Sequence, residues 1–282
     1  MKLRKFFYRL TVLFLSAALF LSGSALARGL ADSLYQKRSS EALAARVADA
    51  RPPLQPTAPI PPENRSTSPT EPTVLPEYAA LFEENPDLVG WLTIEGTKIN
   101  YPVMQTPDRP DHYLYRNFKQ EQSAHGCLYV RESCDVFAPS DNLTVYGHHM
   151  RDGTMLAGLD YYKKQSFYEQ LPYITFDTLW GTYYYRVFGI FTVNLKVKKD
   201  AEFDYRQPEY ESEEAFLEFI KEVKERSYYD NGVQVKGDDR IITLSTCTYP
   251  TGRPGIDNAR LVMMARLCTP EEEAEIAKAA NN

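Results

Sequence analysis

The sequence predicts a mainly β protein with accessory helices, arranged as a closed or partly closed barrel. Short runs with strong β signals follow one another along the second half of the chain, separated by irregular connections. Aromatic residues are plentiful, with 20 Tyr and 14 Phe, and they favour a strand-rich core. The 282 residues, 43% of them apolar, suit one globular domain with attachments better than two full domains.

An apolar segment near the N-terminus predicts a membrane anchor. Residues 10–27 are apolar, and residues 1–9 before them carry basic side chains: Lys2, Arg4, Lys5 and Arg9. A basic flank before an apolar run sends a chain into the export pathway with its N-terminus held in the cytoplasm. The run is near the lower length limit for crossing a bilayer. We expect a single-pass signal anchor in the cell membrane, with the rest of the chain outside; cleavage after Ala27, at a small-x-small sequence, stays open.

Residues 28–76 predict a stalk that is first helical and then proline-rich. Residues 30–50 have helical propensity but only a weak apolar face, and residues 51–76 hold nine prolines. Proline at that density blocks helices and sheet ladders and favours extended polyproline II. The folded domain is therefore expected over residues 77–282.

Within the domain, each expected element follows from local signals. Runs with period-two alternation or β-branched and aromatic content predict strands over two parts of 90–105, divided at Gly96, and over 126–130, 142–146, 173–177, 182–194, 240–247 and 259–267. Short helices are expected from residue 77 to just before Pro86 and within 154–171. The clearest helix covers 211–229, where apolar residues recur at helical spacing and acidic residues crowd the first turns.

Charge and cysteine usage exclude several classes of function. The net charge is -6 and no basic stripe with interleaved aromatics is present, so a nucleic-acid partner is not expected. The four cysteines are Cys127, Cys134, Cys247 and Cys268. Their spacing is no disulfide framework and contains no C-x-x-C pair, so no metal site or cofactor is expected. A Cys127–Cys134 bridge stays open because so short a loop is easily closed.

Three residues in the predicted domain could carry nucleophilic chemistry. Cys247 stands at the end of a strand that opens into a loop, a position that exposes a reactive group on a rigid scaffold. His148 follows another strand and a glycine, and it is the leading candidate for the proton acceptor that a thiol nucleophile needs. Arg260 opens the next strand, which would pair antiparallel with the cysteine strand. Its guanidinium could then stabilise a thiolate or an oxyanion.

Each of these residues also has a structural interpretation. A cysteine in an apolar strand is usually a core residue, a loop histidine is usually a surface residue, and Arg260 could extend along a strand end. Arg253 is a rival to Arg260, closer in sequence to Cys247. His112 and His125 have no comparable strand-end context and are interpreted as loop residues.

Four motifs resemble the class B sortases, a family of cysteine transpeptidases. Residues 243–247 (TLSTC) resemble the nucleophile motif of the family, and residues 146–150 (YGHHM) resemble its histidine motif. Residues 85–105 are similar to the opening of the class B domain, and residues 259–262 (ARLV) match its arginine strand. The resemblance covers about residues 77–268, with the motifs in the right order.

The resemblance implies an eight-stranded sortase barrel with a long helix before the last two strands. It implies that Cys247 attacks the carbonyl of a threonine in a C-terminal sorting motif and forms a thioester, while His148 protonates the leaving amine. An amine of a cell-wall (peptidoglycan) precursor would then release the surface protein from the enzyme. Arg260 would position the substrate backbone or the oxyanion. The expected substrate-binding residues are Ser245, Thr246 and Asn100.

The sequence departs from the family beside the expected groove. Thr248 stands where class B members often have an acidic residue, and the loop between Cys247 and Arg260 is somewhat longer, which puts in doubt the sorting motif rather than the chemistry. The chain shows neither the lid motif nor the second apolar run typical of class C sortases. Alternatives are a class B sortase that assembles pilins, a secreted thiol peptidase that uses water, and a non-catalytic tethered binding domain in which Cys247 is a core residue.

Overall fold

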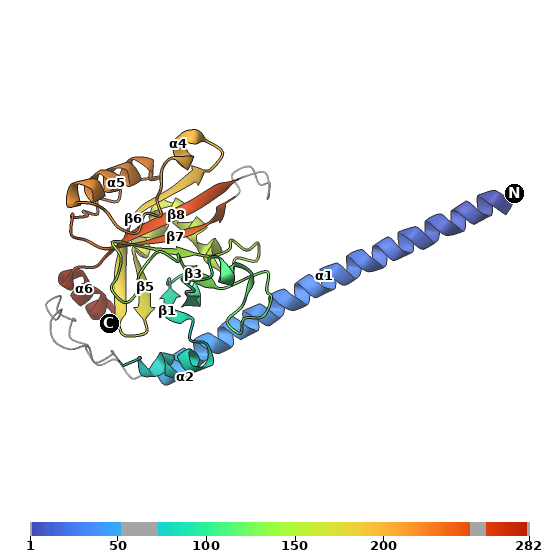
Figure 1. The fold of residues 1–282 in the computed structure, drawn as a ribbon, viewed down its shortest axis with the longest axis horizontal. Helices are drawn as coiled ribbons and strands as arrows, with labels where there is room; N and C mark the ends of the chain where they lie inside the picture. Colours follow the sequence, from blue (N-terminus) through green and yellow to red (C-terminus); the bar gives the residue numbers. More distant parts are fainter. Residues whose placement is uncertain (1, 52–72, 249–257, 281–282) are drawn as a thin grey trace.

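The eight-stranded barrel is confirmed by the computed structural model, which describes residues 2–51, 73–248 and 258–280 (Figure 1). The strands close in the order β1-β2-β3-β4-β7-β8-β6-β5. Their bounds are β1 Leu88–Thr93, β2 Asn100–Met104, β3 Leu128–Val130, β4 Asn142–Tyr146, β5 Tyr173–Thr178, β6 Thr182–Asn194, β7 Ile241–Thr248 and β8 Ala259–Leu267.

The helices lie outside the barrel (Figure 1). They are α1 Lys2–Ala50, α2 Pro76–Glu84, the 3₁₀ helices η1 His112–Tyr115 and η2 Leu156–Lys163, α3 Gln165–Gln170, α4 Lys198–Ala201, α5 Glu213–Arg226 and α6 Pro270–Ala280. The long helix before the last two strands, α5, is the predicted one. Three helices, η1, α4 and α6, were not predicted from the sequence. Helix α6 has three glutamates in its first turn, where they favour a helix N-terminus.

The position of α5 follows from its capping and from a glycine beneath it. The Ser212 hydroxyl accepts a hydrogen bond from the backbone N–H of Ala215, which satisfies one of the free donors of the first turn. The buried face of α5 consists of Phe216, Ile220 and Val223. A Cβ at Gly189 of β6 would lie 2.7 Å from the Val223 side chain, so the missing side chain lets the helix approach the sheet closely.

The part of the barrel that carries the predicted chemistry contains one parallel and two antiparallel strand pairs. β4 pairs with β7 in parallel, with Tyr146 opposite Ser245. β7 and β8 pair antiparallel, and β8 pairs antiparallel with β6. The carboxyl ends of β4 and β7 therefore meet the amino end of β8 at one end of the barrel, which we call the catalytic end because the predicted catalytic residues lie there.

The N-terminal helix is long, and its two halves have different surroundings (Figure 1). The most apolar 18-residue window has a mean hydropathy of 2.0 and is not buried, so this part is long and apolar enough to cross a membrane. The C-terminal half packs with α2 on the outside of the barrel, where Leu43 and Val47 join a cluster around Tyr78 and Trp91. Part of the segment expected as a stalk thus lies against the barrel. Its residues 52–72 are outside the described part of the chain.

Candidate active site

The strand pairing brings the three candidate residues side by side. Cys247 in β7 is directly opposite Arg260 in β8. Tyr146 at the end of β4 pairs in parallel with Ser245 of β7. His148 and Cys247 each come two residues later, so His148 lies level with Cys247, on the side of β7 opposite to β8. Side chains two residues apart on a strand share a face. The order across the sheet is therefore Arg260, Cys247, His148, with each side chain half-buried.

The link between β4 and β7 extends beyond the last strand residues. The Thr246 hydroxyl donates to the carbonyl of Gly147 at 2.7 Å, and the Gly147 N–H donates to the carbonyl of Ser245 at 3.3 Å. These bonds hold the residue before His148 against the residue before Cys247. The distance between the two candidate groups is therefore set by backbone geometry rather than by long side chains.

The His148 ring is oriented by a backbone carbonyl from η1. Its Nε2 lies 2.7 Å from the carbonyl oxygen of Leu114. A carbonyl only accepts hydrogen bonds, so Nε2 carries a proton, and in the neutral ring Nδ1 is the nitrogen free to accept one. The Tyr115 ring also lies beside it, with ring centroids 5.4 Å apart.

Burial lowers the pKa of His148 below its ordinary value of 6.5, and a positive charge on His125 would lower it further, while the bond to Leu114 opposes both. The neutral imidazole is therefore the resting form at neutral pH. We expect the His148 ring signals to titrate with a midpoint below 6.5 in an NMR pH titration of the folded domain. Because the folded pKa is depressed, stability contributed by the neutral ring should be lost as pH falls through that midpoint. A midpoint at or above 6.5 would contradict this assignment.

Gly126 holds η1 in the place that His148 requires, and sequence reasoning missed this contact. Gly126 has φ +59°, and a Cβ there would lie 2.4 Å from the Leu114 carbonyl oxygen and 2.6 Å from that of Tyr113. The backbone after β2 and the backbone before β3 thus touch without side chains between them. A glycine as the first residue of the predicted strand 126–130 is the only sequence signal for this approach.

Gly126→Ala should therefore displace the carbonyl that orients His148. We expect a loss of about 1–3 kcal/mol in the free energy of unfolding, from left-handed strain and steric clash, together with reduced activity. Urea unfolding and a rate assay would measure both effects. Gly232→Ala is the matched control, because Gly232 has φ +71° but no atom within 4 Å of its would-be Cβ. Equal losses in the two variants would show that the clash with η1 has no effect.

The predicted substrate-binding residues lie in different places. Ser245 is 2% exposed, and its hydroxyl is 3.0 Å from the Tyr205 hydroxyl, which belongs to the connection that covers this face of the sheet. Thr246 is also 2% exposed and bonds to the histidine loop. Asn100 Oδ1 accepts a hydrogen bond from Trp91 Nε1 of β1, and its role in substrate binding stays a prediction. The rival Arg253 lies outside the described residues.

Within the described residues, the hydrogen-bond partners of Arg260 are uncharged. Its Nη1 bonds to its neighbours, the carbonyl of Ala259 at 3.1 Å and the Asn258 side chain at 3.5 Å. Among residues 2–51, 73–248 and 258–280, no carboxylate lies within 4.0 Å of the guanidinium. A cation beside a thiol in this arrangement is suited to stabilise developing negative charge.

Histidine 125, interpreted above as a loop residue, is a buried side chain near this site. It is 6% exposed, and its Nε2 lies 3.6 Å from Asp152 Oδ2. His112 lies in η1, with its Nε2 3.2 Å from Arg109. Within the described residues, no group of three or more His, Cys, Asp or Glu side chains is arranged to hold a metal ion.

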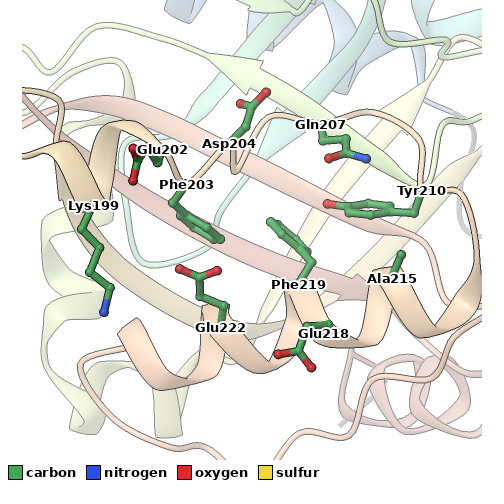
Figure 2. Close-up of a pocket in the computed structure, with 10 residues that line it drawn as sticks. All are labelled: Lys199, Glu202, Phe203, Asp204, Gln207, Tyr210, Ala215, Glu218, Phe219 and Glu222. Atoms are coloured by element: carbon green, nitrogen blue, oxygen red, sulfur yellow. The ribbon is translucent and has the colours of Figure 1, made fainter.

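A cavity of about 590 Å³ lies elsewhere, between α5 and the connection before it (Figure 2). Figure 2 shows Phe203, Phe219 and Tyr210 at its floor with carboxylates around them. Each of those carboxylates has a basic partner within 4.0 Å, and Arg226 also lies 4.3 Å from the Phe203 ring centroid. None of the three candidate residues lines this cavity. It is a packing cleft of α5, away from the three candidate residues.

The sequence that carries this half-buried thiol, between a histidine and an arginine, matches a known protein family. The family model described as "Sortase domain" matches residues 92–268. The chain belongs to the sortase family. Its sequence is 35% identical to Sortase B of Staphylococcus aureus over 174 residues, which are 62% of this chain and 68% of that protein. It is 32% identical to Sortase B of Listeria monocytogenes over 193 residues, which are 68% and 74% of the two chains.

The structural comparison agrees with this sortase assignment. The Staphylococcus aureus sortase B–substrate complex superposes with a TM-score of 0.69 at 28% identity, covering 85% of this chain and 99% of that one. The covered share exceeds the residues matched by the family model, so the resemblance extends beyond the catalytic motifs. The chain is a sortase of the B type, a cysteine transpeptidase, as the motifs predicted. The thiol-peptidase and binding-domain alternatives are not favoured.

Proposed function

We propose that Cys247 is the nucleophile, His148 the general acid and base, and Arg260 the oxyanion-stabilising cation of this transpeptidase. The observation that supports the proposal is the register that sets Arg260 and His148 on either side of Cys247. Nucleophile, proton carrier and cation are the three groups that acyl transfer through a thioester requires.

The proton path in this mechanism follows from the His148 tautomer. The thiol proton of Cys247 passes to Nδ1 of His148 as sulfur attacks the threonine carbonyl of the sorting motif. The tetrahedral intermediate collapses to a thioester when the C–N bond breaks, and His148 returns the proton to the leaving amine. An acceptor amine then attacks the thioester and gives up its proton to His148. The C–S bond breaks, and the thiolate is restored and reprotonated.

Arg260→Ala should reduce the rate of acylation by about 10²- to 10³-fold, because the oxyanion loses its charged donor. Arg260→Lys should recover part of this loss, since an ammonium keeps the charge but not the planar fork. Single-turnover acylation of Cys247 measures the effect. Arg240→Ala is the control, as Arg240 lies before the far end of β7 and only approaches Asp141 at 4.0 Å. If Arg240→Ala reduced the acylation rate as much as Arg260→Ala, the location of Arg260 beside Cys247 would not explain the effect.

The partners we propose are surface proteins with a C-terminal sorting motif and an amine of peptidoglycan or its precursor. We also propose that residues 10–27 anchor the enzyme in the cell membrane as a single pass, with the barrel outside. The support for the anchor is the apolar, unburied N-terminal half of α1 behind a basic flank.

The test uses the purified chain with a panel of sorting-motif peptides, with and without a glycine or diamino-acid amine. Mass spectrometry follows the peptides and the enzyme. An adduct on Cys247 together with an amine-dependent joined product would support the proposal and identify the motif. Cleavage that is unaffected by the amine would overturn transpeptidation as the reaction, because water would then be the acceptor.

A further inference from the structure

Helix α1 runs along the barrel with its N-terminal side at the catalytic end. The Ser33 hydroxyl donates to Asp152 Oδ2 at 3.0 Å, four residues after His148. Eighteen residues later, Arg51 bonds to Asp177 of β5. From Ser33 to Arg51 the helix rises about 27 Å.

The two ends of this contact correspond to opposite ends of the barrel. Asp177 pairs with Thr182 at the start of β6, whereas Arg260 pairs with Val193 near its end. Eleven residues of strand separate Thr182 from Val193, which is roughly 36 Å along β6. After the apolar segment, the chain therefore contacts the catalytic end of the barrel first, at Ser33, and the far end later, at Arg51.

The distance between the apolar segment and the first contact with the barrel is short. The apolar run ends at Ala27, and six residues of helix to Ser33 rise about 9 Å. The headgroup layer on each side of a bilayer is roughly 5–8 Å thick. Beyond Ser33 the buried side of α1 continues through Gln36, Leu43 and Val47, which are 6%, 7% and 5% exposed. The barrel thus begins where the headgroups end.

Four basic side chains lie in the segments that meet α1 at this height: Lys98, Arg116, Lys119 and Arg151. Lys98 Nζ donates to the carbonyl of Asp152 at 2.7 Å. The Tyr35 hydroxyl of α1 donates to Glu121 at 3.2 Å. Arg116 and Lys119 lie in the short stretch of chain between η1 and Glu121. In the described part of the chain, none of the four has a carboxylate within 4.0 Å. Two acids of these segments bond to α1, Asp152 to Ser33 and Glu121 to Tyr35, whereas Glu95 is exposed near Lys98.

We propose that the catalytic end of the barrel rests on the outer leaflet of the membrane, that the docking of α1 fixes it there, and that these four basic side chains contact anionic phospholipid headgroups. The proposal rests on the membrane anchoring proposed above. Arginine and lysine near a bilayer surface are attracted to anionic lipid within a Debye length. A rigid helix in place of a flexible tether restricts Cys247 to substrates close to the bilayer.

The test measures height above the membrane with the full chain in nanodiscs. A donor dye is attached through Lys119→Cys at the catalytic end or through Glu271→Cys in α6 at the far end, both in a Cys247→Ala background. The remaining native cysteines are buried, so they do not compete for the dye. We expect energy transfer to a lipid-borne acceptor to be at least about twofold greater from position 119, given the roughly 36 Å of strand between the two ends. Equal transfer, or greater transfer from position 271, would overturn the proposal.

Two variants separate the parts of the proposal. Inserting seven helical residues after Arg28 raises the barrel by about 10 Å above the membrane. Seven residues make nearly two full turns, so the same side of the barrel still faces the membrane, and energy transfer from position 119 should fall. Energy transfer from position 119 should also fall when anionic lipid is replaced with zwitterionic lipid. It should fall likewise when Lys98 and Arg151 are both replaced with Gln. Unchanged transfer in both experiments would overturn the proposed contact with anionic headgroups. A chain that does not insert into nanodiscs overturns the anchor and the docking together, whereas peptide acylation of Cys247 in detergent tests the chemistry independently.

Discussion

Replacing Cys247 with alanine should abolish acyl-enzyme formation and reduce transpeptidation by at least about 10³-fold, because no other thiol can form the thioester. Cys127, Cys134 and Cys268 are 7%, 5% and 8% exposed, whereas Cys247 is half-buried at a strand end. Burial also raises the pKa of these three thiols, that of Cys268 to about 12, which suppresses the reactive thiolate. Intact-protein mass spectrometry with a sorting-motif peptide measures the adduct directly.

Cys134→Ser is the matched control for this prediction. The Cys134 thiol only donates to the carbonyl of Asn142 at 3.5 Å, and a serine hydroxyl can replace that bond. Cys127 and Cys134 are separate free thiols in different apolar clusters, so the variant breaks no bridge. Activity should stay near that of the unchanged chain. An adduct that persists in Cys247→Ala, or activity lost in Cys134→Ser, would require a different nucleophile or a structural disulfide.

Replacing His148 with alanine should reduce acylation by about 10²- to 10⁴-fold without unfolding the domain, because proton transfer to and from the substrate loses its carrier. His148→Gln separates proton transfer from positioning, since a glutamine amide can donate to the Leu114 carbonyl but cannot move a proton. Both variants should therefore be similarly slow. Rates of adduct formation and thermal unfolding of each variant measure the two effects.

His112→Ala is the control for the His148 variants. His112 is a second histidine of the same neighbourhood, in η1, but its ring lies against Tyr113 and Arg109 and not in the row of candidate groups. Its removal should leave the acylation rate within about threefold of normal, as is usual for a side chain outside the reacting groups. If His148→Gln kept most of the activity, His148 would have only a positioning role.

The strands are largely predictable from the sequence because their signals are local. The bounds of β4 and β8 coincide with the predicted runs 142–146 and 259–267. The position of Arg260 opposite Cys247 is also predictable, because consecutive strands in this part of the chain pair antiparallel. The placement of His148 beside Cys247 is different. It depends on β4 pairing in parallel with β7, and no local pattern specifies which distant strands become neighbours.

The parts of the site that the sequence does not reveal involve backbone atoms or sparse patterns. The partner of His148 is the carbonyl of Leu114, and a carbonyl has no sequence signature. The docking side of α1 has only Leu43 and Val47 as buried apolar residues, too few for a clear helical stripe. His125 resembles an ordinary loop histidine in the sequence, and its place beside Asp152 of the histidine loop comes from the tertiary fold.

The parallel pairing of β4 with β7 has a consequence for how the enzyme matures. Gly147 and Thr246, which join the histidine and cysteine segments, are 99 positions apart, and the intervening chain forms β5, β6 and α5. Contacts across such a sequence separation form late and slowly, because the chain must lose the entropy of closing a long loop before these contacts can stabilise it. Until then Cys247 has no histidine beside it to take its proton and should behave as an ordinary thiol. Nucleophilic reactivity therefore arises in the last steps of folding.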